Sequence, residues 1–228
     1  MQERPVYHSQ TATAGLDVQA HKVLRNTYML LAMTIAFSAV CAFATMAMNL
    51  GRGPALIMSL AALAIVWLVL PRTQNSASGI WTVFLFTGLL GGSLGPMLNA
   101  YLSLANGPSL IMQALGGTAF IFFGLSGYVL TTKKDFSFLG GFLMAGLLVV
   151  IACAVIFFVA GFFGVHVPGV HLAISAAIML LMSGFILFDT SRIINGGETN
   201  YIRATVSLYL NIYNIFTSLL HLLGAMDD

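Results

Sequence analysis

The feature that most constrains this chain is a series of apolar stretches, most of them long enough to cross a membrane. A helix needs about 20 apolar residues to span the hydrocarbon core of a bilayer, which is ~30 Å thick. Only 7% of the residues are charged, whereas about a quarter are charged in an ordinary soluble domain. We therefore predict an all-α membrane protein with seven transmembrane helices. The expected spans are residues 28–50, 55–70, 80–101, 108–130, 138–163, 170–188 and 205–223.

The second expected span, residues 55–70, is the shortest, and without it six helices would remain. The basic residues argue for retaining it, because Lys and Arg near helix ends stay on the cytoplasmic side. With seven helices, only Arg52 falls on the outer side. The eight basic residues on the inner side are Arg4, Lys22, Arg25, Arg72, Lys133, Lys134, Arg192 and Arg203. This distribution predicts a cytoplasmic N-terminus and a C-terminus outside.

The polar N-terminal segment, residues 1–27, precedes the first span and does not resemble a cleavable signal peptide. Small residues in its Thr11–Gly15 stretch favour flexibility over roughly the first fifteen residues. We expect a cytoplasmic tail over residues 1–27 and a transmembrane domain over residues 28–228. The tail is either a simple solvated extension or an unfolded handle for a cytoplasmic partner.

Glycine and proline mark the third expected span. Gly91 and Gly95 are four residues apart, a spacing that lets a neighbouring helix backbone approach closely. Pro96 follows directly, removes one backbone hydrogen bond and is expected to kink the helix. We interpret the three as packing and kink residues.

Asp189 is the one carboxylate that directly adjoins a long apolar run, near the inner end of the sixth span. Ionisable residues within membranes are costly and therefore informative. One interpretation is an interfacial ion pair with Arg192, three residues further on. The other is a gate or a proton or cation site. Asn211 and Asn214 of the seventh span either face Asp189 or bond between helices.

No set of residues in the sequence indicates catalysis or a metal site. There is no HExxH motif, no carboxylate pair at an evident catalytic spacing, and no nucleophile beside a recognisable base. Cys41 and Cys153 lack metal-binding spacing and are read as packing residues. His166, His171 and His221 are read as interfacial residues. We therefore expect neither an enzyme nor a cofactor or metal site, and no nucleic-acid partner.

Four segments, residues 21–28, 94–96, 128–141 and 196–209, together resemble the Bax inhibitor family, most closely its bacterial YccA branch. The resemblance runs from about residue 21 to the C-terminus. It implies a seven-helix bundle in the bacterial inner membrane, with the seventh helix surrounded by the other six. For this branch it also implies a protein that binds the membrane-anchored, ATP-dependent protease FtsH and restrains it. In that case the tail becomes a candidate protease contact, and its polar residues Glu3, Arg4, His8 and Asp17 are the candidates.

The family also contains members that leak calcium in a pH-dependent way through a pair of aspartates. Asp189 matches the first of these, but the second position corresponds to Asn211, which cannot titrate. Two close carboxylates share a proton, whereas one carboxylate beside an arginine stays ionised. We therefore rank a calcium or proton leak below protease modulation. The glycine-rich faces permit contacts within one chain or between chains, so the oligomeric state stays open.

Overall fold

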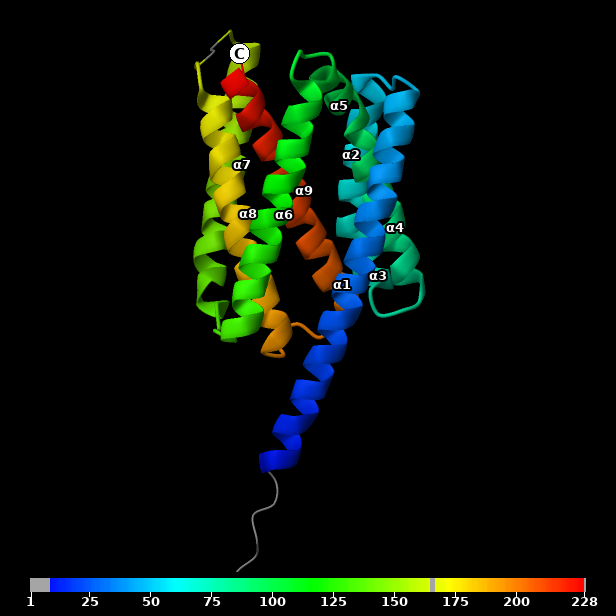
Figure 1. Cartoon of the computed structure of the whole chain (residues 1–228), viewed down its shortest axis with the longest axis vertical. Helices are drawn as coiled ribbons and strands as arrows, with labels where there is room; N and C mark the ends of the chain where they lie inside the picture. The colour runs from blue at the N-terminus through cyan, green and yellow to red at the C-terminus, as the bar shows by residue number, and fades with distance from the viewer. Residues whose placement is uncertain (1–8, 165–166, 228) are drawn as a thin grey trace, which may run out of the picture.

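A computed structural model describes residues 9–164 and 167–227 as an antiparallel bundle of helices (Figure 1). Seven helical segments in this part of the chain are long and apolar enough to cross a membrane. This confirms the predicted all-α fold with seven spans. In chain order the elements are α1 (Ser9–Ala47), α2 (Arg52–Ala64), η1 (Ile65–Val69), α3 (Leu70–Thr73), α4 (Ser78–Ser93), α5 (Gly95–Leu102), α6 (Gly107–Thr132), η2 (Ser137–Leu139), α7 (Gly140–Phe162), α8 (Val170–Ile194) and α9 (Tyr201–Asp227).

The second span is longer than expected, because α2, η1 and α3 form one helical segment of 22 residues, Arg52–Thr73. Within it, η1 has the wider π-helical winding, in which the Leu70 N–H bonds to the Ile65 carbonyl five residues back. Pro71 is the next residue, and because proline has no backbone N–H it cannot donate a hydrogen bond to the preceding turn. The irregular winding extends the helix past the proline, so the segment reaches membrane-spanning length.

The first helix begins well before the expected start of its span at residue 28, since α1 already starts at Ser9. Val23 and Thr27 are buried in the bundle, and the Thr27 carbonyl accepts a hydrogen bond of 3.3 Å from the Thr205 hydroxyl of α9. Polarity marks where the apolar core of a bilayer ends, not where a helix ends. The sequence therefore located the start of the apolar span but not that of the helix.

The third span is interrupted at Leu94, between α4 and α5, just before Pro96. Proline at position 96 cannot donate to the carbonyl of Gly92, four residues earlier. The hydroxyl of Thr45 in α1 donates to that carbonyl instead, at 2.8 Å. Gly95 makes room for this contact, since a Cβ there would lie 2.3 Å from the Thr45 hydroxyl oxygen. The break is thus repaired by a neighbouring helix, as lipid-embedded backbone requires.

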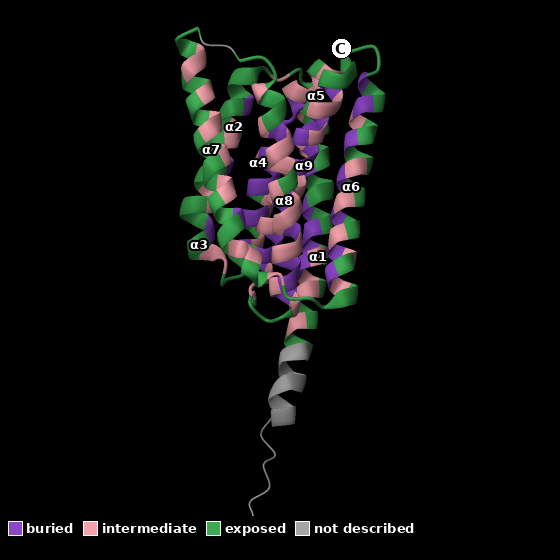
Figure 2. Cartoon of the chain, turned by 90° about the vertical axis from the view of Figure 1, so that its left-hand side faces the viewer, coloured by how far each residue is buried: buried purple, intermediate pink, exposed green. Residues whose placement is uncertain are grey.

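Helix α9 packs against four other helices, α1, α4, α6 and α8, and α7 packs mainly against α8. Figure 2 shows buried residues along α9 and α4 and a largely exposed α7. Of the α7 residues only Leu143 is buried. Large apolar side chains such as Phe120 and Phe162 are exposed on the outside, which suits a surface that contacts lipid. Because neighbouring spans alternate in direction, the same end of the bundle holds the start of α1, Arg72 at the end of the second span, Lys133 just after α6, and Arg192 in the last turn of α8.

Candidate functional site

The contact between α8 and α9 holds the buried carboxylate that the sequence singled out. Asp189 follows the apolar stretch of α8 and is only 9% exposed. Its Oδ2 atom accepts a hydrogen bond of 2.6 Å from the Ser207 hydroxyl and another of 2.8 Å from the Asn211 amide. Ser207 and Asn211 are four residues apart in α9, so one face of that helix presents both donors to the carboxylate.

Arg192 does not pair with Asp189, so the ion-pair interpretation is wrong. Its guanidinium donates to the Gly197 carbonyl at 2.9 Å and lies 5.4 Å from the centre of the Phe188 ring. Within the described residues the ion pair that forms is Arg203 with Glu198, at 2.9 Å. The reason is geometric: Asp189 faces inward toward α9, whereas Arg192 extends from the last turn of α8 toward the loop that follows.

The two asparagines of α9 have different partners. The Asn211 amide bonds to Asp189, and Asn211 is itself buried. The Asn214 amide donates to the Leu210 carbonyl of its own helix at 2.8 Å and does not reach Asp189. Asn211 therefore faces Asp189, one of the two alternatives left open by the sequence, whereas the bond of Asn214 lies within α9 and matches neither.

Further polar groups lie beside this contact. The Tyr28 hydroxyl of α1 is 2.7 Å from the Ser126 hydroxyl of α6, which is 3.1 Å from the hydroxyl of Thr190 in α8. Thr190 adjoins Asp189, so α1, α6, α8 and α9 all contribute hydroxyl groups near the same end of the bundle. Sequence reasoning missed Ser126, Thr190 and Ser207, because hydroxyl residues are common in membrane helices and nothing local marks these.

The arrangement joins a single carboxylate to neutral donors. Within the described residues no cluster of three or more His, Cys, Asp or Glu side chains is placed to hold a metal ion. Chemically, such a carboxylate can hold α9 against α8, and it can bind a proton or interact with a cation that reaches it. These are the two uses that the geometry allows.

The other predicted site residues lie elsewhere. Gly91 packs against α1, where a Cβ would be 2.3 Å from the Ser38 carbonyl oxygen, and Gly95 and Pro96 lie at the break described above. The candidate tail contacts Glu3, Arg4 and His8 lie outside the described residues. For Asp17, the structure describes the backbone alone, as part of α1.

Comparison with known proteins relates the whole bundle to one family. The family model described as "Inhibitor of apoptosis-promoting Bax1" matches residues 20–228, a range that includes the α8–α9 contact and all of the spans except the first two residues of the first one. The chain is similar to the "Modulator of FtsH protease YccA" of Escherichia coli K12, with 55% identity over 222 residues and 97% of each chain covered. It is 54% identical, over 220 residues and 96% of each chain, to an uncharacterized membrane protein of Vibrio cholerae. An uncharacterized protein of Pseudomonas aeruginosa is 48% identical over 202 residues, 89% of this chain and 88% of that one.

Proposed function

Since the chain belongs to the Bax inhibitor family, we propose that it is an inner-membrane protein that binds the membrane-anchored protease FtsH and negatively modulates it. The observation that carries the proposal is the 55% identity, over 97% of both chains, to a protein named as a modulator of that protease. A relative from another E. coli strain, similar over the same length, is named an inner membrane protein. The aligned part of the chain includes helices and loops alike.

The first helix supports the proposal, because α1 extends beyond the ends of the other helices on the side away from the C-terminus (Figure 1). In the orientation expected from the basic residues, this side faces the cytoplasm, where ATP is available to the protease. The proposed contact is the segment of residues 1–20, with Glu3, Arg4, His8 and Asp17 as its candidate polar residues.

The stability of the bundle suggests how the chain restrains the protease without being rapidly degraded by it. Its described spans are joined by short loops, such as residues 103–106 and 133–136. A helix bundle in lipid offers few unpaired backbone groups, so pulling it apart is costly. Such a body, once engaged through its N-terminal segment, occupies the protease and delays its other membrane substrates.

The test is the decay rate of a membrane substrate of FtsH, reconstituted with the protease in vesicles, with and without an excess of this protein. We expect slower decay and co-purification of the two proteins. A chain lacking residues 2–20 is the variant to compare, because it retains α1 from His21 onward. It is expected to insert normally, to lose the effect and to be degraded more slowly itself. Unchanged substrate decay without association of the two proteins would refute the proposal.

A second candidate function is a leak for calcium ions or protons through the bundle. The observation in its favour is that Asp189 is buried and accepts hydrogen bonds from the neutral donors Ser207 and Asn211, with no ion pair to Arg192 among the described residues. It ranks second because Asn211, which faces the carboxylate, is an amide and cannot titrate. Calcium and proton flux into liposomes holding the purified protein tests it, with Asp189→Asn as the variant and Asn214→Ala as the control. Equal flux from wild type and Asp189→Asn would remove Asp189 from the pathway.

A further inference from the structure

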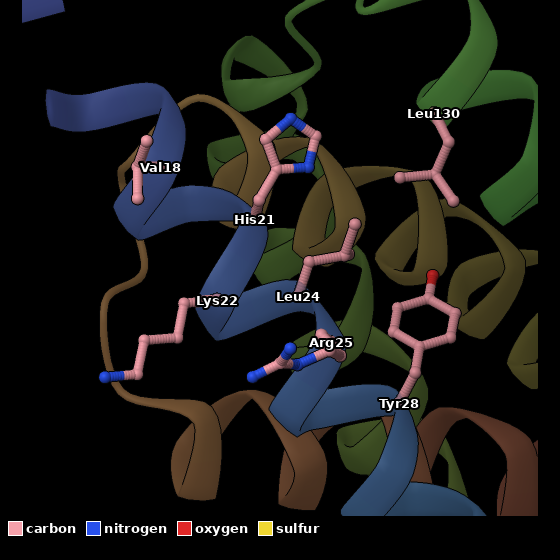
Figure 3. A pocket seen from close by; sticks show the side chains of 7 residues that line it. All are labelled: Val18, His21, Lys22, Leu24, Arg25, Tyr28 and Leu130. Atoms are coloured by element: carbon pink, nitrogen blue, oxygen red, sulfur yellow. The ribbon is translucent and has the colours of Figure 1, made fainter. Parts of the chain in front are cut away.

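A groove of about 650 Å³ lies where α1 emerges from the bundle, between α1 and the C-terminal end of α6. It is lined by Val18, His21, Lys22, Leu24, Arg25, Tyr28 and Leu130 (Figure 3). A smaller hollow of about 140 Å³ shares His21, Leu24 and Leu130 with it and adds Lys133. The two hollows therefore adjoin, and basic residues surround them on both helices.

Four basic residues at this end of the bundle, outside the groove, have a polar partner within the protein. Arg72 donates to the Leu68 carbonyl, Lys134 bonds the Tyr128 hydroxyl, and Arg203 pairs with Glu198. Arg192 donates to the Gly197 carbonyl.

Lys22 and Arg25, in contrast, are exposed and have no hydrogen-bond or ion-pair partner among the described side chains. Figure 3 shows their charged ends extending to the same side of α1. No carboxylate is among the described residues that line the groove. The charged side chains described there are all basic, which suits an anion.

The apolar part of the lining determines what kind of anion fits. Leu24 and Leu130 form part of the groove wall, and Val18 at its edge is 70% exposed. Met29, one residue beyond Tyr28, is 60% exposed on the outside of α1. A small soluble anion has no apolar groups to pack against these side chains, whereas the glycerol and acyl groups of a lipid would cover them.

The depth of the groove matches the headgroup layer of a bilayer. Residues 28–47 of α1 have a length of about 30 Å, at about 1.5 Å per residue, and so fill the hydrocarbon core. Lys22 and Arg25 then lie roughly 5–9 Å outside it, at the level of lipid phosphates. Trp67 lies near the end of the second span and Trp81 near the start of the third, and both are exposed. Aromatic residues are enriched at such positions near the membrane interface.

We propose that this groove binds the headgroup of an anionic phospholipid from the leaflet on that side. Arg25 and Lys22 bond the phosphate oxygens, and Arg25 is able to do so with two N–H groups at once. His21 lines both hollows and Lys133 the smaller one, and Leu24 and Leu130 contact the glycerol and upper acyl region. Basic pockets between membrane helices on the cytoplasmic side are typical of such lipid sites. The proposal is independent of any contact with FtsH.

The experiment compares lipid binding by the full chain in detergent, measured by native mass spectrometry. Phosphatidylglycerol is titrated against phosphatidylcholine with the same acyl chains. We expect the wild type to prefer phosphatidylglycerol. The double variant Lys22→Gln/Arg25→Gln should bind it roughly thirtyfold more weakly, about fivefold for each lost cation. The control Arg72→Gln/Lys134→Gln removes the same charge at the same end, outside the groove, and should bind like the wild type.

Three results would overturn the proposal. The first is equal phosphatidylglycerol binding by the wild type and the groove variant. The second is displacement of the lipid by millimolar inorganic phosphate, which would identify a site for soluble anions. The third is a groove variant that binds lipid normally but no longer co-purifies with FtsH, since the groove would then receive a protein segment. Weaker lipid binding by the groove variant alone, without competition from phosphate, supports it.

Discussion

At the scale of single residues, Asp189 illustrates how a buried carboxylate is accommodated without a cation. Burying an ionised group is costly unless it is paired or hydrogen-bonded. Ser207 and Asn211 supply two short hydrogen bonds to the same oxygen atom. Both donors belong to α9, so the carboxylate links the sixth and seventh spans near their shared loop. The same link places Asp189 where it contributes to stability even if no ion ever reaches it.

Replacing Asp189 by alanine therefore tests its structural role. In Asp189→Ala the buried Asn211 amide loses its acceptor, which costs about 1–3 kcal/mol. For a chain of this size we expect the thermal midpoint in detergent, followed by circular dichroism, to fall by roughly 2–4 °C per kcal/mol. Asn214→Ala is the control, because that amide bonds only a carbonyl of its own helix. A variant as stable as the wild type would show that the α8–α9 link carries no stability.

At the scale of helices, close approach between α1 and α4 depends on glycine. A Cβ at Gly91 would lie 2.3 Å from both the carbonyl and the hydroxyl oxygen of Ser38. The Ser38 hydroxyl is also 2.6 Å from the Tyr209 hydroxyl of α9. Any side chain at position 91 therefore pushes α1 away from α4 and disturbs a buried bond to a third helix.

Gly91→Ala is accordingly expected to destabilise the bundle by about 1–3 kcal/mol, the usual cost of overpacking. Gly116 in α6 is the matched control, since nothing lies within 4 Å of a Cβ added there. Gly116→Ala should be neutral or stabilising by about 0.5–1 kcal/mol, because alanine favours a helix over glycine. Denaturation of both variants in the same detergent measures the contrast. Equal effects of the two substitutions would mean that backbone preference, not helix contact, determines the outcome.

The helices also show what the sequence was able to predict. Apolar length gave all seven spans, because crossing lipid leaves a long uninterrupted signal. A carboxylate beside an apolar run stood out for the same reason, so Asp189 was found. Its partner was not determined, because Arg192 and Asn211 were both plausible, and the choice depends on how α8 and α9 are rotated against each other. The repair of the Pro96 break by Thr45 was also missed, since the two residues lie on different helices and nothing local connects them.

At the scale of the whole molecule, charge is concentrated at one end of the bundle. The end from which α1 protrudes carries most of the basic residues, in the loops and in the adjoining helix ends, whereas Arg52 lies at the other end. Retention of positive charge on the cytoplasmic side then predicts the orientation. The proposed protease contact and the proposed lipid groove both lie at this end. Both therefore require this end to face the cytoplasm.

Cysteine accessibility tests that orientation. In a chain whose native cysteines are removed by Cys41→Ala and Cys153→Ala, one new cysteine is introduced at a time. Ser103→Cys lies in the loop between α5 and α6, and Ser137→Cys lies near the start of the fifth span; both positions are exposed. A maleimide that cannot cross the inner membrane should label Ser103→Cys in spheroplasts and Ser137→Cys only after lysis. The reverse pattern would place the protruding end of α1 outside, beyond the reach of an ATP-dependent protease, and would refute the proposed function together with the orientation.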